Sequence, residues 1–230
     1  MSVNTVRART EIGRTTWRTP RTEVPASILE EKRRIYPLPH VNIPYLSGLQ
    51  EKQKNGLVNA EDIVFNQRFI KRIKNDCDQP VRGILVIEDD ELGCQAFTTR
   101  LRSRFRDWDR WILNMGITEI GDHPAMELEA DEFPLFFAST RQDYDLVPEL
   151  VLANPGLIHL VISDLRLEGY PSGGRGIARQ LRLGGYQGWL LFCSGSLEGK
   201  GLEEAELFVD KFFFLSEFID DLLTVPSTQE

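Results

Sequence analysis

The sequence predicts an α/β fold in which a doubly wound, five-stranded parallel sheet carries helices on both faces. From about residue 82 onward, short apolar runs of the kind buried on both faces alternate with segments of helical periodicity. Each of these apolar runs ends at a polar or charged residue. The longest apolar runs are far shorter than the roughly 18 residues of a membrane span, and three widely separated cysteines exclude a scaffold built on disulfides.

The expected elements follow one another in a regular order. Strands are predicted at residues 83–87, 134–138, 157–163, 188–193 and 206–209. Helices are predicted at residues 92–105, 148–153 and 175–183, and a last helix runs from Ser216 to a stop at Pro226. In a parallel sheet of this kind, ligands bind at the carboxyl ends of the strands. The residues that follow the strands are therefore the candidates for a functional site.

The charge is divided unevenly along the chain. Residues 1–80 hold 14 basic and 9 acidic residues, a net charge of +5, whereas the remainder carries −13. We therefore expect two parts: an N-terminal extension at 1–80, partly disordered with a helix near 59–75, and a domain at 81–230 with an insertion near 107–133. The helix near 59–75 either packs on the following domain, which we favour, or binds a partner. The basic extension suits an acidic surface, including that of its own chain, better than nucleic acid.

Five chemically useful residues stand at the ends of the predicted strands: Glu88, Asp89, Asp164, Ser194 and Lys211. A single Asp or Ser at a strand end is an ordinary turn residue, so the inference depends on the whole set. Three converging carboxylates would repel one another, and a divalent cation such as Mg²⁺ removes that conflict. A carboxylate at such a centre can attack a phosphoryl group, whose oxygens a hydroxyl and an ammonium would bind.

Four stretches of the chain extend this interpretation to a family. They read ILVIEDD at 84–90, LVISDLRL at 160–167, LLFCSGS at 190–196 and VDKFF at 209–213. With them, residues 82–225 resemble the receiver domain of bacterial two-component response regulators, which has a flavodoxin-like fold. The resemblance implies that Asp164 is the phosphoacceptor and that Mg²⁺ is held by Glu88, Asp89, Asp164 and the main-chain carbonyl of Arg166. It assigns Ser194 and Lys211 to the same site.

The resemblance also implies a biological role. We expect a stand-alone, cytoplasmic response regulator in a phosphorelay, phosphorylated on Asp164 by a histidine kinase or phosphotransfer protein. The resemblance points to Ser194 and Phe208 as switch residues, although a core aromatic is an equally good interpretation of Phe208. The short stretch after Lys211 leads us to expect output through contacts with an unidentified protein and not through an enzymatic or DNA-binding domain. Neither a membrane nor an enzymatic activity is expected; an aspartyl-phosphate phosphatase is disfavoured because Arg166 stands where such enzymes often have a second acid.

The sequence also departs from the family pattern. Phe212 follows Lys211 where the family has proline, and Glu168 replaces a proline expected soon after the phosphoacceptor. The interval between Asp89 and Asp164 is long, and that between Ser194 and Lys211 is short. These departures favour an alternative function, a phosphorylation-independent interaction or scaffold module that keeps the receiver fold.

Overall fold

The computed structural model describes residues 38–74, 80–104, 112–117, 133–195 and 202–225. Within these residues, seven strands form the central sheet: β2 (Ile63–Phe65), β3 (Ile84–Ile87), β4 (Ile112–Gly116), β5 (Phe133–Ala138), β6 (Leu160–Ser163), β7 (Trp189–Ser194) and β8 (Leu207–Asp210). A small antiparallel pair joins β1 (His40–Val41) to β9 (Leu223–Thr224). The longer helices are α2 (Ile43–Lys54), α3 (Gln67–Lys74), α4 (Glu91–Arg104), α6 (Arg141–Ala153) and α7 (Gly173–Leu183). The C-terminal helical segment consists of α8 (Lys211–Phe213), the π-helical turn η3 (Phe214–Phe218) and α9 (Ile219–Leu222).

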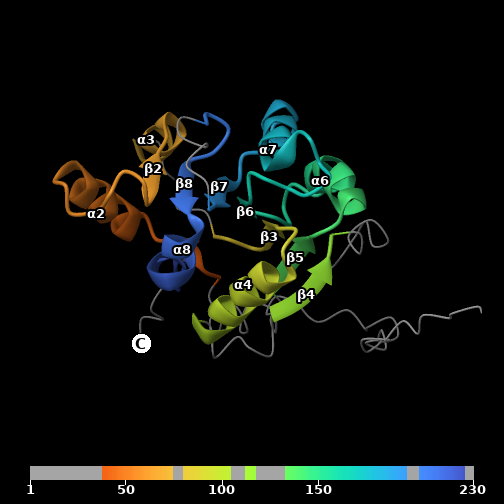
Figure 1. Cartoon of the computed structure of the whole chain (residues 1–230), viewed down its shortest axis with the longest axis horizontal. Helices are drawn as coiled ribbons and strands as arrows, with labels where there is room; N and C mark the ends of the chain where they lie inside the picture. Colours follow the sequence, from red (N-terminus) through yellow and green to blue (C-terminus); the bar gives the residue numbers. More distant parts are fainter. Residues whose placement is uncertain (1–37, 75–79, 105–111, 118–132, 196–201, 226–230) are drawn as a thin grey trace, which may run out of the picture.

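The strands of the sheet lie in the order β2-β8-β7-β6-β3-β5-β4 (Figure 1). All neighbouring pairs are parallel except β2 with β8. The prediction of an α/β fold with a parallel-dominated sheet is thus confirmed. The five expected strands have the order 2-1-3-4-5 when they are numbered along the chain, which is consistent with a flavodoxin-like fold.

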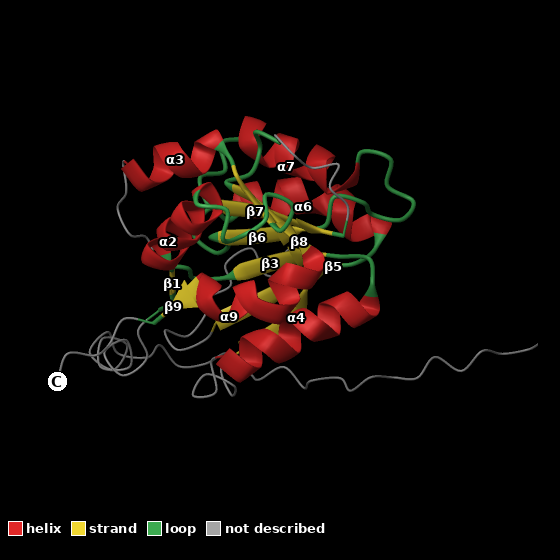
Figure 2. Ribbon diagram, turned by 60° about the vertical axis from the view of Figure 1, so that its left-hand side comes forward, coloured by secondary structure: helices red, strands yellow, loops and turns green. Residues whose placement is uncertain are grey.

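Helices cover the sheet on both faces because successive side chains of each strand point to opposite sides. Within β3, Ile84 and Val86 join a core with α2, α3, α4, η3 and α9, whereas Leu85 and Ile87 join a second core with α6 and α7. Figure 2 shows α6 and α7 on one side of the sheet and α4 and α9 on the other. A central strand that is buried on both faces must be apolar at every position, which is why these strands were visible in the sequence.

The predicted count of five strands was wrong, because one strand is added at each edge of the sheet. Residues 112–116 lie within the expected insertion and pair with β5 as the parallel edge strand β4. At the other edge, β2 pairs antiparallel with β8, with Val64 opposite Phe208. The additions pair main-chain groups of β5 and β8 that would otherwise lie at the edges of the sheet.

The helix expected near residues 59–75 begins later than predicted. Ile63–Phe65 is a strand, and α3 covers only Gln67–Lys74. The apolar positions at 63, 69, 70 and 73 share a helical spacing, but the free edge of β8 offers Ile63–Phe65 main-chain partners that an extra helical turn could not supply. Tertiary pairing therefore decides the conformation of these three residues.

Residues 38–74 share a core with the rest of the chain. Leu46 of α2 and Phe69 of α3 are completely buried in the cluster that also contains Ile84, Leu191 and Leu222. The expected boundary near residue 80 therefore does not separate two hydrophobic cores. Residues 1–37, which include the part of the extension expected to be disordered, and most of the insertion near 107–133 lie outside the described residues. No helix in the described part of the chain is both long and apolar enough to cross a membrane.

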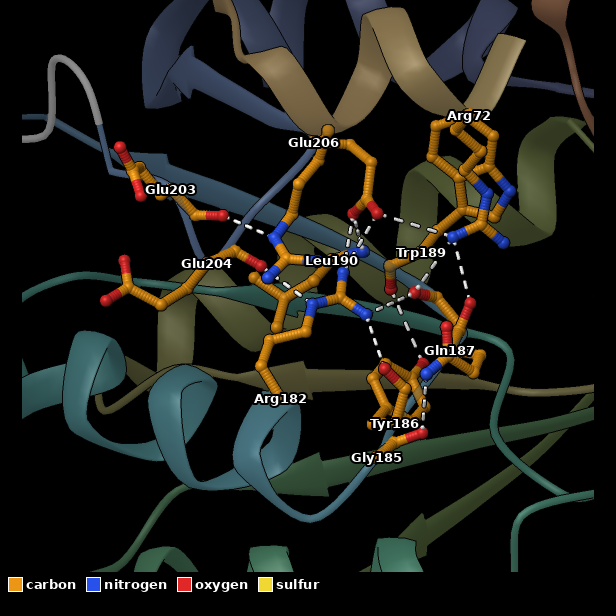
Figure 3. Close-up of polar contacts among 12 residues, drawn as sticks. Arg72, Arg182, Gly185, Tyr186, Gln187, Trp189, Leu190, Glu203, Glu204 and Glu206 are labelled. Carbon is orange, nitrogen blue, oxygen red and sulfur yellow. Dashed lines mark hydrogen bonds and ion pairs between the residues drawn. The ribbon is translucent and has the colours of Figure 1, made fainter. Parts of the chain in front are cut away.

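A buried carboxylate ties α3 to the sheet (Figure 3). Glu206, just before β8, accepts hydrogen bonds from Arg182 Nη2 at 2.7 Å and from the main-chain amide of Leu190 at 2.8 Å. Arg72 of α3 reaches the other oxygen of Glu206 at 3.3 Å, and its guanidinium lies 4.3 Å from the centre of the Trp189 ring. One acidic side chain thus connects α3, α7, β7 and β8.

We predict that Glu206→Gln lowers the free energy of unfolding by about 3–5 kcal/mol, the usual cost of removing one charge from a buried pair. The side chains of Glu206 and Arg182 are only 4% and 8% exposed, so the substitution leaves a guanidinium buried without its counter-charge. Urea denaturation measures the change. Glu204→Gln is the matched control: Glu204 pairs with the exposed Arg175 and Arg179, and its loss should cost at most about 1 kcal/mol. Equal losses in both variants would contradict the prediction.

Candidate functional site

The strand order brings two acidic strand ends together. The chain runs from β3 to the edge strand β4, returns to β5 beside β3, and then crosses β3 to reach β6, so the direction of the connections reverses between β3 and β6. Such a switch point opens a crevice at the carboxyl ends of the strands. Ile87 is aligned with Ser163, and the amide of Asp164 donates to the carbonyl of Ile87 at 2.9 Å. The residues that follow these two strands, Glu88 and Asp164, are therefore held side by side by the sheet itself.

Three carboxylates meet at this point. One oxygen each of Glu88, Asp89 and Asp164 lies within 4.8 Å of the others. Glu88 is almost completely buried and Asp164 is close to that state, whereas Asp89 lies nearer to solvent. The structure brings together all three acidic residues that the sequence singled out.

Lys211 supplies the counter-charge. It is the first residue after β8, and its Nζ lies 2.6 Å from Glu88 Oε2 and 3.0 Å from Asp164 Oδ2. Its side chain is 22% exposed, whereas that of Glu88 is 1% exposed. The ammonium thus bridges two of the three carboxylates and leaves Asp89 outside the bridge.

The pKa values of the two bridged partners reflect burial and attraction together. Burial raises the pKa of the Glu88 carboxyl above its ordinary value, and the hydrogen bond and charge of Lys211 offset only part of that effect. Burial alone would lower the pKa of Lys211, but its bonds to Glu88 and Asp164 and their negative charge outweigh burial and raise it. Lys211 is therefore firmly cationic at neutral pH.

The loop after β6 fixes the Asp164 carboxylate. The amide of Arg166 donates to Asp164 Oδ1 at 3.1 Å, which folds the main chain of Arg166 back beside the carboxylate. Gly174, in the first turn of α7, packs against this loop: a Cβ there would lie 1.9 Å from the carbonyl oxygen of Asp164. Only glycine permits this approach. The two glycines that begin α7, Gly173 and Gly174, thus allow the helix to pack closely against the loop after β6.

Glu168, which stands where the family pattern has a proline, fixes the side chain of Asp89. The main-chain amide of Glu168 donates to Asp89 Oδ2 at 2.5 Å. A proline at this position has no N–H and could not make this bond. The departure therefore adds a hydrogen bond between the loop after β6 and the loop after β3.

Of the two remaining predicted residues, Ser194 lies at the end of the neighbouring strand β7 and Phe208 lies within β8. Ser194 is the last residue of β7, is buried, and is aligned with Asp210, the residue before Lys211. Phe208 is completely buried in the core beneath α6 and α7, as a core aromatic would be. Phe212, which replaces the family's proline, is 81% exposed, and the side chain of Asp210 caps α8 by accepting from the amides of Phe212 and Phe213.

The donor set fits a hard divalent cation. Three carboxylates offer only oxygen ligands, which Mg²⁺ prefers. Glu88 and Asp164 each bond Lys211 through one oxygen and a main-chain amide through the other, so lone pairs remain on both. Glu88, Asp89 and Asp164 would hold the cation, and the position of Arg166 leaves its carbonyl as a further candidate.

The comparisons with known proteins find similarity among solved structures only. No family model and no curated protein matches the chain. Among solved structures, the chain is similar to one described as the BeF3-activated DrrB receiver domain. That match has a TM-score of 0.33 and 18% identity, and it covers 57% of this chain and 85% of that domain. The function proposed below rests on the geometry of the site.

Sequence reasoning missed one polar group near the site. Tyr144, in the second turn of α6, is 1% exposed, and its hydroxyl has no hydrogen-bond partner among the described residues. The helix that carries it was expected only from residue 148, whereas a capping box between Thr140 and Asp143 starts it at Arg141. The capping box could have been recognised from the sequence, because Thr140 and Asp143 have the spacing that it requires.

We predict that Lys211→Gln destabilises the protein in a pH-dependent way. Without the ammonium, the pKa of Glu88 in the folded state rises further above its value in the unfolded chain. A carboxyl with a raised pKa favours the folded state when protonated, so its contribution is lost as the pH rises. In the presence of a chelator, the variant should lose about 3 kcal/mol near neutral pH and less at acidic pH. Denaturation at both pH values measures this, with Lys71→Gln, at an exposed position of α3, as the control. A loss independent of pH would contradict the account.

Proposed function

We propose that this chain is a response regulator, a signalling protein and not an enzyme, that is phosphorylated on Asp164 by a histidine kinase or phosphotransfer protein in the presence of Mg²⁺. The observation that carries the proposal is the convergence of Glu88, Asp89, Asp164 and Lys211 at one switch point of the sheet. A cation at the carboxylates would neutralise charge on the entering phosphoryl group. We further propose that the protein acts in the cytoplasm through contacts with another protein.

The chain's own groups fit the phosphoryl transfer. An oxygen lone pair of Asp164 forms the new O–P bond, the N–P bond of the donor phosphohistidine breaks, and its electron pair returns to the imidazole nitrogen. Lys211 Nζ, 3.0 Å from Asp164 Oδ2, is within reach of a phosphoryl oxygen on that carboxylate. The alignment of β7 with β8 brings the Ser194 position to the same edge of the sheet.

The signal has a short route to the N-terminal segment. Charge added at Asp164 changes the bonds of Lys211, which begins α8 directly after β8. The amide of Asp210, the preceding residue, donates to the carbonyl of Asp62 at 2.8 Å, and β2 follows at once. We propose that phosphorylation acts on a partner through this edge of the sheet, with Ser194 and Phe208 as the switch residues.

Treatment with acetyl phosphate and Mg²⁺ tests the proposal. We predict a slower band on a phosphate-affinity gel for the wild type, no such band for Asp164→Asn, and a strongly reduced one for Asp89→Asn. Asp90→Asn is the matched control, because Asp90 lies in the same acidic run but caps α4 by accepting from the amides of Leu92 and Gly93. Asparagine keeps one acceptor oxygen and is as good a capping residue as aspartate. A band that persists in Asp164→Asn would sink the proposal.

A second candidate function is a scaffold module whose contacts do not depend on phosphorylation. It is favoured by the bridge from Lys211 to Glu88 and Asp164, since the ammonium alone can offset the repulsion between these two carboxylates. It is also favoured by the edge of β8, which β2 of the same chain occupies. A wild-type protein that stays unmodified by acetyl phosphate, although folded, would support this candidate over the first.

A further inference from the structure

A buried hydroxyl that bonds none of the described residues lies close to the carboxylate site. Tyr144 is 1% exposed, and its hydroxyl makes no hydrogen bond with any described residue. Leaving a buried donor unpaired destabilises a folded protein, so such a group requires an explanation. By contrast, Tyr186, another buried tyrosine, donates its hydroxyl to the carbonyl of Trp189 at 3.4 Å.

The position of Tyr144 follows from the strand order. Helix α6 starts directly after β5, and β5 lies beside β3, so that the amide of Glu88 donates to the carbonyl of Ala138 at 3.0 Å. The rings of Tyr144 and Tyr170 pack in a T-shaped arrangement with their centres 5.4 Å apart. Tyr170 belongs to the loop whose Glu168 amide bonds Asp89. Tyr144 therefore lies where the loops after β3 and β6 meet.

The electrostatics of the hydroxyl agree with this placement. Burial raises the pKa of the Tyr144 phenol, and the negative charges of Asp89, Asp143 and Glu88 raise it further, with Asp89 the largest of the three. Two of the three site carboxylates thus act on this group. The phenol keeps its proton at all physiological pH values and is a hydrogen-bond donor under the influence of negative charge.

We propose that Tyr144 is a positioning residue of the divalent-cation site. Its hydroxyl finds its missing partner when the cation binds, and it then donates to the Asp89 carboxylate, either directly or through a water molecule of the hydrated cation. The Glu168 amide occupies Oδ2 of Asp89, and the remaining lone pairs of that carboxylate suffice for the cation and the phenol. Donors behind a metal ligand fix its orientation. The inference rests on the cation site of the proposed function.

Tyr144→Phe tests the inference because it removes only the hydroxyl. We predict that Mg²⁺ affinity, measured by titration calorimetry on the full chain, falls about tenfold. We also predict that the stability of the variant in chelator equals or exceeds that of the wild type, because an unpaired donor has been removed. Tyr186→Phe is the matched control: it removes a satisfied hydroxyl, so it should lower stability in chelator and leave Mg²⁺ affinity unchanged.

The other outcomes separate this inference from the proposed function. Equal Mg²⁺ affinity of the wild type and Tyr144→Phe would overturn the role of Tyr144 and leave the cation site standing. Loss of stability in chelator, in parallel with lost affinity, would assign Tyr144 to the core and overturn its positioning role. Absence of Mg²⁺ binding in the wild type would overturn both this inference and the cation-dependent function.

Discussion

The bond from Lys211 to both Glu88 and Asp164 is the interaction on which the rest of the site depends. The parallel register of β3 and β6 forces the two carboxylates together, and Glu88 has almost no access to water that could stabilise its charge. One ammonium, placed by the end of β8, offsets the repulsion. The same ammonium stands where a phosphoryl group on Asp164 would need a cation. The stability of the fold and the proposed phosphoryl transfer therefore both depend on the side chain of Lys211.

The N-terminal segment belongs to the same physical unit. Strand β2 pairs with β8, and Arg72 of α3 reaches the buried carboxylate of Glu206 at the start of that strand. Strand β8 is thus held by the N-terminal segment at its start and along its edge, and it delivers Lys211 at its end. A change in the bonds of Lys211 acts on a strand whose outer neighbour is residues 63–65. This arrangement gives the proposed output edge a physical basis.

Sequence reasoning predicted most of the sheet and the acidic cluster for a clear reason. A strand buried on both faces is an uninterrupted apolar run, and the residue after it stands out, as Glu88 and Asp164 do. The edge strand β2 was missed because the extended conformation of Ile63–Phe65 is determined by pairing with β8 and not by the apolar pattern of these residues. The role of the Glu168 amide was missed because the spacing of residues does not show where a main-chain N–H points. The Tyr144 hydroxyl was missed because sequence spacing does not show which buried donors lack a hydrogen-bond partner among the described residues.

Direct location of the modified residue tests the central claim most closely. The protein would be treated with acetyl phosphate and Mg²⁺ and then reduced with borohydride, which converts an aspartyl phosphate to homoserine and leaves free carboxylates unchanged. Peptide mass spectrometry then identifies the converted residue. The account predicts conversion at Asp164 alone, and only in samples that contained Mg²⁺. Conversion at Asp89 or another carboxylate instead of Asp164, or equal conversion at Asp164 without a divalent cation, would contradict it.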